Sequence, residues 1–191
     1  MVRAPGGGSE HGDQVCHVVH FHLPAQPRIA GDQVHLGLAG EGHAVGDIGN
    51  TADTADVKSK SNIHWQNFVE VLGFTDDKAE ENIKQYKKIA EELESHLQAS
   101  VIGHRTSLSP HAPYTISPKT FEVINKATKG KIISIHNQEH PAEDELYKTG
   151  GGGFLQLFKI FGMDRSPFPV TGKSSIRSIL PHFNSGQTIF L

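Results

Sequence analysis

Residues 131–139 read KIISIHNQE, a short apolar run that ends in His136 and is followed by Glu139. The run Ile132–Ile135 has the composition of a strand buried on both faces, which is typical of a parallel sheet. A histidine at the end of such a strand can ligate a metal through a neutral ring nitrogen. A carboxylate three residues later can move protons to and from a metal-activated water. His136 is therefore the candidate metal ligand, and Glu139 is the candidate catalytic acid and base.

Strand and helix patterns alternate on both sides of this stretch. Such alternation predicts parallel strands covered by helices, with ligands bound at the carboxyl ends of the strands. We therefore expect residues 44–191 to form one α/β domain. The expected strands are 44–48, 68–74, 98–108, 131–136 and 188–191, and the expected helices are 76–95, 117–130, 141–146, 154–162 and 174–183.

A second candidate segment, Ser109–Tyr114, follows the third of these strands. Its histidine, His111, is flanked by Pro110 and Pro113, which restrict the backbone and present the ring in a fixed direction. Such a presentation suits a substrate contact. The alternative is an ordinary proline turn that leaves His111 exposed.

Composition limits the class of partner. The chain has a net charge of −3 and a pI near 6.5, which does not favour nucleic acid or an anionic membrane as a partner. No apolar run reaches the roughly 18 residues of a membrane span. Cys16 is the single cysteine, so no internal disulfide can form, as is usual in the cytoplasm. We expect a cytoplasmic protein with a small-molecule substrate, and a homo-oligomer is left open.

Residues 1–43 differ from the rest of the chain. They hold no lysine, but they hold six of the thirteen histidines and eight of the twenty glycines. A Gly/His-rich segment with few branched apolar residues buries little surface, so we expect it to be disordered. A misread frame or a wrong start would also explain the abrupt change. We therefore divide the chain into an atypical segment, 1–43, and a domain, 44–191.

Several of these motifs together resemble those of a known family. Ser109–Ser117 (SPHAPYTIS) and Ile133–Glu139 (ISIHNQE) are similar to segments of the amidohydrolase superfamily. The most similar branch is that of the cytosine, guanine and S-adenosylhomocysteine deaminases and the chlorohydrolases. Ala44–Ile48 and Asn67–Val71 resemble its second and third barrel strands. The resemblance covers about residues 44–191 and implies a partial (β/α)8 barrel, roughly strands two to six.

The resemblance also implies roles for the three candidate residues. It makes His136 a ligand of one divalent metal, zinc or iron, and it places His111 in the substrate pocket. It makes Glu139 the group that carries protons between the activated water and the leaving ammonia. A bound metal lowers the pKa of water from about 16 towards 7. The implied reaction is hydrolytic deamination of a nitrogen heterocycle.

Other parts of the family pattern are missing or doubtful. His20-Phe21-His22 has the form of the His-x-His motif of the first strand, but only 21 residues separate it from Ala44. The metal ligands expected after the sixth and eighth strands are not in the chain. We therefore expect the 191-residue chain to be inactive and poorly soluble by itself. The alternatives are a non-catalytic half-barrel that binds or scaffolds a partner, and a gene-prediction artefact.

Overall fold

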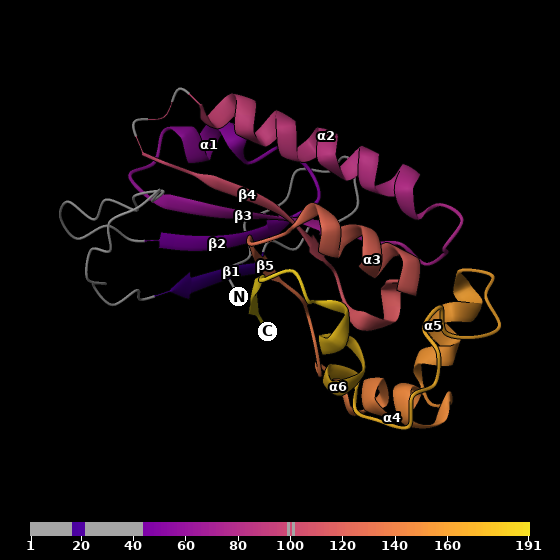
Figure 1. Cartoon of the computed structure of the whole chain (residues 1–191). Helices are drawn as coiled ribbons and strands as arrows, with labels where there is room; N and C mark the ends of the chain where they lie inside the picture. The colour runs from indigo at the N-terminus through magenta and orange to yellow at the C-terminus, as the bar shows by residue number, and fades with distance from the viewer. Residues whose placement is uncertain (1–16, 22–43, 99, 101) are drawn as a thin grey trace, which may run out of the picture.

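The computed structural model describes residues 17–21, 44–98, 100 and 102–191, and in it strands alternate with helices along the chain (Figure 1). This order confirms the predicted α/β class. The strands are β1 (His17–Phe21), β2 (Ala44–Gly49), β3 (His64–Val71), β4 (Arg105–Pro110), β5 (Ile132–Ser134) and β6 (Thr188–Phe190). The helices are α1 (Ala55–Ser59), α2 (Ala79–Leu97), α3 (Pro118–Ala127), α4 (Pro141–Thr149), α5 (Phe154–Ile160) and α6 (Ser175–Ile179).

The strands form two sheets. β2, β3 and β4 are parallel neighbours in a four-stranded sheet, and β5 pairs in parallel with β6 in a second sheet. Serine side chains join the two sheets: Ser107 Oγ donates to the Ile132 carbonyl at 2.6 Å, and the Ser134 amide donates to Ser109 Oγ at 3.1 Å. The predicted parallel arrangement is therefore confirmed, whereas the described strands do not close into a barrel.

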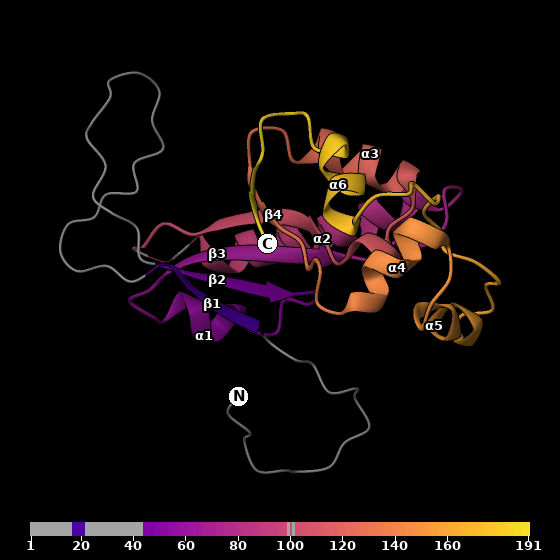
Figure 2. The same ribbon diagram turned by 90° about the horizontal axis from the view of Figure 1, so that it is seen from below.

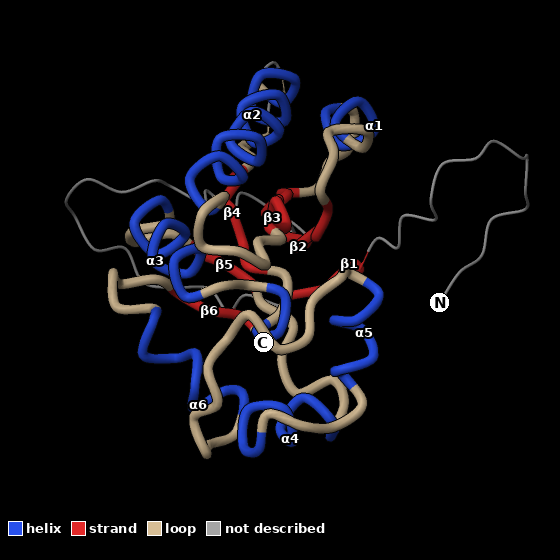
Figure 3. The backbone as a smooth tube through the Cα atoms, turned by 90° about the vertical axis from the view of Figure 1, so that its right-hand side faces the viewer, coloured by secondary structure: helices blue, strands red, loops and turns tan. Residues whose placement is uncertain are grey.

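The helices lie in two groups around the four-stranded sheet. α1, α2 and α3 lie along one side of the sheet, and α4, α5 and α6 lie beyond the carboxyl ends of β2, β3 and β4 (Figures 2 and 3). On β3, Val69 and Val71 are fully buried in the apolar core that includes Ile83 and Leu93 of α2. Because side chains alternate along a strand, Glu70 faces the opposite side of the sheet.

Helix starts follow the local chemistry of the sequence. Ser117 precedes α3, and its hydroxyl accepts a hydrogen bond from the Thr120 amide at 3.3 Å, with Pro118 in the first helical position. Within the part of the chain that the structure describes, no helix has both the length and the apolar character to cross a membrane.

β1 has the wrong direction for the first strand of a parallel barrel. It runs antiparallel to β2, and the register pairs His20 with Val45 and Phe21 with Ala44. His20 therefore lies beside the amino end of β2, whereas the candidate residues of the sequence follow the carboxyl ends of β4 and β5. This geometry argues against reading His20-Phe21-His22 as the first-strand metal motif. His22, and the rest of the 1–43 segment apart from β1, lie outside the described residues.

Candidate active site

Three neighbouring strands deliver the candidate site. Glu70 is the last residue but one of β3, His111 directly follows β4, and His136 follows β5. Backbone hydrogen bonds continue between the segments that follow these strands. The His111 amide donates to the Val71 carbonyl at 3.0 Å, and the His136 amide donates to the His111 carbonyl at 2.9 Å. These bonds fix the three side chains at the same edge of the fold.

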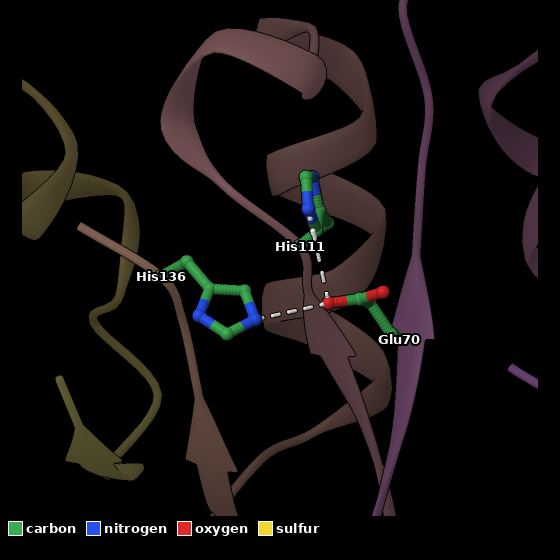
Figure 4. Close-up of side chains that lie close together, drawn as sticks. All are labelled: Glu70, His111 and His136. Atoms are coloured by element: carbon green, nitrogen blue, oxygen red, sulfur yellow. Dashed lines mark ion pairs between the residues drawn. The ribbon is translucent and has the colours of Figure 1, made fainter. Parts of the chain in front are cut away.

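A carboxylate oxygen lies between the two imidazole rings, as Figure 4 shows. Glu70 Oε1 is 3.3 Å from His136 Nε2 and 4.0 Å from His111 Nε2. The two ring centroids are 5.5 Å apart. All three side chains are partly buried, with 17%, 26% and 19% exposure for Glu70, His111 and His136. Two nitrogens and one oxygen therefore converge on one point that solvent can reach, and they form a group that could hold a metal ion.

The hydrogen bonds of His111 define its tautomer. Thr115 Oγ1 donates its proton to the Ala112 carbonyl at 2.9 Å, so it can only accept from His111 Nδ1, also at 2.9 Å. Burial lowers the pKa of His111, and this outweighs the charge of Glu70, so the neutral ring is favoured. In that neutral ring, Nε2 carries a lone pair that faces the Glu70 carboxylate. Two acceptors that face each other favour a cation between them.

His136 lies between two carboxylates. Its Nε2 faces Glu70 Oε1, and its Nδ1 is 3.3 Å from Glu139 Oε1. The hydrogen bond to Glu70 raises the pKa of His136, with a further contribution from the charge of Glu139. Glu139 is 52% exposed and can therefore meet a molecule that enters from solvent. A carboxylate on the far nitrogen of a metal-ligating histidine is a common orienting arrangement.

Tyr114 closes one side of the site. Its ring stacks on Phe154 with centroids 4.3 Å apart and meets the His111 ring edge-on at 6.1 Å. Burial, followed by the charges of nearby glutamates, raises the pKa of Tyr114 to about 12. The phenol therefore keeps its proton at neutral pH and can act as a hydrogen-bond donor.

The structure places all three residues predicted from sequence in one cluster. His111 and His136 meet across Glu70, and Glu139 contacts His136. Their assigned roles in substrate binding, metal binding and catalysis stay predictions. Glu70 was not predicted as a site residue. The sequence signal that could have found it is a charged residue within an apolar strand. In the structure, this side chain faces away from the helices that cover the sheet.

Comparisons with known proteins point to one group of enzymes. No family model matches the chain. Over 111 residues, 56% of this chain, the sequence is 32% identical to the aminodeoxyfutalosine deaminase of Deinococcus radiodurans, and the match covers 26% of that protein. The matched part of the chain is therefore similar to part of an amidohydrolase-type deaminase. It spans about a quarter of the length of the curated relative that it matches.

A solved structure of an amidohydrolase-type deaminase has a similar fold. The crystal structure of Helicobacter pylori aminofutalosine deaminase matches with a TM-score of 0.61 at 18% identity. The match covers 74% of this chain and 35% of the Helicobacter chain. At this identity the likeness concerns the fold, and it agrees with the partial coverage of the Deinococcus sequence.

Proposed function

We propose that this chain carries part of the active site of a metal-dependent aminohydrolase that hydrolyses an exocyclic amino group from a nitrogen heterocycle. The observation that carries the proposal is the convergence of Glu70, His111 and His136, with Glu139 beside them, at the carboxyl ends of three strands. This edge of a parallel α/β fold is where catalytic groups gather. The similarity to amidohydrolase-type deaminases supports the reaction class.

The donor set fits a divalent metal. At zinc distances of about 2.0–2.1 Å in tetrahedral geometry, ligand atoms lie about 3.3 Å apart. The pair formed by Glu70 Oε1 and His136 Nε2 has this separation, 3.3 Å, and the His111 pair at 4.0 Å needs only a small side-chain rotation. Three protein ligands and one open position are typical of catalytic zinc. A bound zinc or iron ion would supply Lewis-acid activation of water.

Experiment can distinguish two candidate roles of His111. The sequence predicts a substrate contact, whereas the geometry also allows a third metal ligand. Replacement of His111 with alanine lowers zinc affinity if the ring is a ligand. The same replacement raises KM and leaves zinc affinity unchanged if the ring contacts only substrate.

Glu139 is the proposed proton carrier. Its carboxylate is exposed and contacts His136 Nδ1, the ring nitrogen that faces away from Glu70, so it must turn towards the Nε2 side to reach the activated water. In hydrolytic deamination, a water oxygen bonds to the carbon that bears the amino group, the carbon–nitrogen bond breaks, and ammonia leaves. The Glu139 carboxylate would accept a proton from the attacking water and pass it to the leaving nitrogen. The name of the Deinococcus relative gives aminodeoxyfutalosine as the first substrate to test.

We expect Glu139→Gln to keep bound metal and to lose at least about 100-fold in kcat, because an amide cannot accept the proton. Metal content is measured by atomic emission and turnover by ammonia release. The assay uses the 191-residue chain and also a chimaera in which residues 44–191 replace the matching segment of the Deinococcus enzyme. The chimaera is included because the chain alone is expected to be inactive.

The control for this experiment is Glu122→Gln, which changes an exposed glutamate on α3 that pairs with lysines. It should leave both metal content and turnover unchanged. A Glu139→Gln chimaera with wild-type turnover would contradict the proposed role. A chimaera that binds no metal, or a metal-loaded chimaera that turns over none of the amino heterocycles tested, would contradict the proposed function.

A further inference from the structure

The loop between the candidate ligand and the candidate acid has an unusual backbone. Gln138, which lies between His136 and Glu139, has φ = 57°, and it is the one non-glycine residue with a positive φ in the described part of the chain. A side chain in the left-handed region is strained, because its Cβ approaches the following carbonyl oxygen too closely. Such a conformation persists only where its surroundings impose it, and it is concentrated at functional sites.

The surroundings of this loop include a fully buried carboxyl group. Glu143 lies in the first turn of α4 with 0% exposure, and its Oε1 accepts a hydrogen bond from Asn137 Nδ2 at 3.0 Å and another from Ser175 Oγ. Asn137 Nδ2 also donates to Ser175 Oγ at 2.7 Å. Burial raises the pKa of Glu143, and the hydrogen bond from Ser175 and the backbone amides of Gln138 and Glu139 oppose this rise. Glu143 therefore binds the loop through Asn137, the residue that precedes the strained Gln138.

The need to cap α4 does not explain why Glu143 is buried. His140 already caps the helix, because its Nδ1 accepts a hydrogen bond from the Ala142 amide at 3.1 Å. An exposed glutamate in the first turn would satisfy the helix dipole equally well. Burial raises the pKa of Glu143, which reflects the cost of keeping a carboxylate away from water. Only one oxygen of the carboxyl group is bonded: Oε1 accepts from Asn137 of the loop and Ser175 of α6, whereas Oε2 has no hydrogen-bond partner among the described residues.

We propose that Glu143 is a positioning residue, whose buried carboxyl group, together with Asn137 and Ser175, holds loop 137–140 in the conformation that keeps Glu139 against His136. The value of this position for catalysis rests on the proposed function. Glu143 acts on the site through the loop, because its Oε1 bonds to Asn137, the residue after His136. The carboxyl group is the element that makes the left-handed backbone at Gln138 stable.

Two variants of similar size test this role. Glu143→Gln keeps the Oε1 acceptor, whereas Glu143→Leu removes both oxygens. The matched control is Glu145→Leu, which changes an exposed residue on the same helix. Backbone NMR of the full chain gives the Cα and Cβ chemical shifts of Gln138, which depend on the sign of φ. Hydrogen exchange gives the protection of the Gln138 and Glu139 amides.

We expect Glu143→Gln and Glu145→Leu to keep the wild-type shifts of Gln138. We expect Glu143→Leu to move those shifts to values typical of negative φ and to speed amide exchange at Gln138 and Glu139 by at least about tenfold. The amides of Leu146 and Tyr147 on α4 stay protected, because their packing does not change. Unchanged Gln138 shifts in Glu143→Leu would overturn the proposal.

A variant outside the helix keeps the test decisive if Glu143→Leu does not fold. Asn137→Ala removes the hydrogen bond from the loop side and leaves α4 intact. It should shift Gln138 in the same direction, and wild-type shifts in Asn137→Ala would then overturn the proposal.

Metal binding and turnover separate this proposal from the proposed function. Glu143→Leu should bind zinc with wild-type affinity and lower kcat of the chimaera by about tenfold or more, because a small displacement of Glu139 is costly. A wild-type chimaera without zinc affinity would overturn the metal-dependent function and leave the shift test of the loop valid. Unchanged Gln138 shifts, with zinc bound and turnover present, would overturn only the positioning role.

Discussion

Zinc affinity is expected to fall by about 100-fold when His136 is replaced with alanine. Structural zinc sites with four ligands bind with about 10–16 kcal/mol, or about 3 kcal/mol for each ligand, and 1.4 kcal/mol corresponds to a factor of ten. His136 should show this loss because its Nε2 has the closer contact with Glu70 and its Nδ1 is held by Glu139. Competition against a chromogenic chelator measures the affinity.

Two control variants identify the source of any zinc binding. His96→Ala changes an exposed histidine on α2 that bonds to the Glu92 carbonyl of its own helix. His20→Ala/His22→Ala changes the histidines that resemble a first-strand motif. Both controls should keep wild-type affinity. If the double variant loses zinc and His136→Ala does not, the proposed ligand set is wrong.

The sequence predicted most of the fold because its signals are local. A proline in the first turn marks both α3 and α4, and the apolar stripe of α2 marks a helix whose observed range, Ala79–Leu97, lies close to the predicted 76–95. Residues 132–136 could be assigned to a strand end because the apolar run stops abruptly at His136. The direction of β1 could not be predicted, since pairing direction depends on contacts with β2 that the pattern of one strand does not specify.

Glu70 was missed because the end of its strand was misplaced. The apolar residues Leu72 and Phe74 extended the predicted strand to residue 74, which put Glu70 in its middle. In the structure β3 ends at Val71, and Gly73 forms an isolated bridge to Ile116. The predicted end of β3 was therefore three residues too late, so Glu70 was not expected at the carboxyl end of the strand, where functional side chains are sought.

α1 was missed for a different reason. Five residues, Ala55–Ser59, are too few to show helical periodicity, and the helix includes a lysine that turns inward. Lys58 is only 4% exposed, and its Nζ donates to Asp47 Oδ2 at 2.5 Å and to Asn67 Oδ1 at 2.7 Å. Lysine is rarely buried unless it is paired, so a sequence pattern assigns it to the surface.

This buried ion pair makes the stability of the sheet sensitive to one carboxylate. We expect Asp47→Ala to lower the free energy of unfolding by about 3–5 kcal/mol, because it leaves the Lys58 ammonium buried with only Asn67 as a hydrogen-bond partner. This loss is a large part of the roughly 5–15 kcal/mol that stabilises a typical domain. Urea denaturation followed by circular dichroism measures the change.

An exposed pair in the same region provides the matched control. Lys60 Nζ lies 2.7 Å from Asp56 Oδ2, but the two side chains are 72% and 75% exposed. Asp56→Ala should therefore leave the free energy of unfolding almost unchanged, since water screens the pair. Equal effects of Asp47→Ala and Asp56→Ala would show that burial does not strengthen the Asp47–Lys58 interaction.

The double variant Asp47→Leu/Lys58→Met tests whether the stability of the sheet depends on the two charges or only on side chains that fill the same volume. Replacing both charges with apolar groups of similar size removes the unpaired ammonium, so most of the stability lost in Asp47→Ala should return. Asn67 would then lose its Lys58 donor, but its Nδ2 still donates to the Arg105 carbonyl at 3.2 Å. Asn67 and Glu70 lie on the same strand, so zinc affinity of the refolded double variant shows whether β3 keeps its register. If the double variant binds zinc with wild-type affinity while Asp47→Ala is unfolded, the ion pair stabilises the sheet but does not set the geometry of the site.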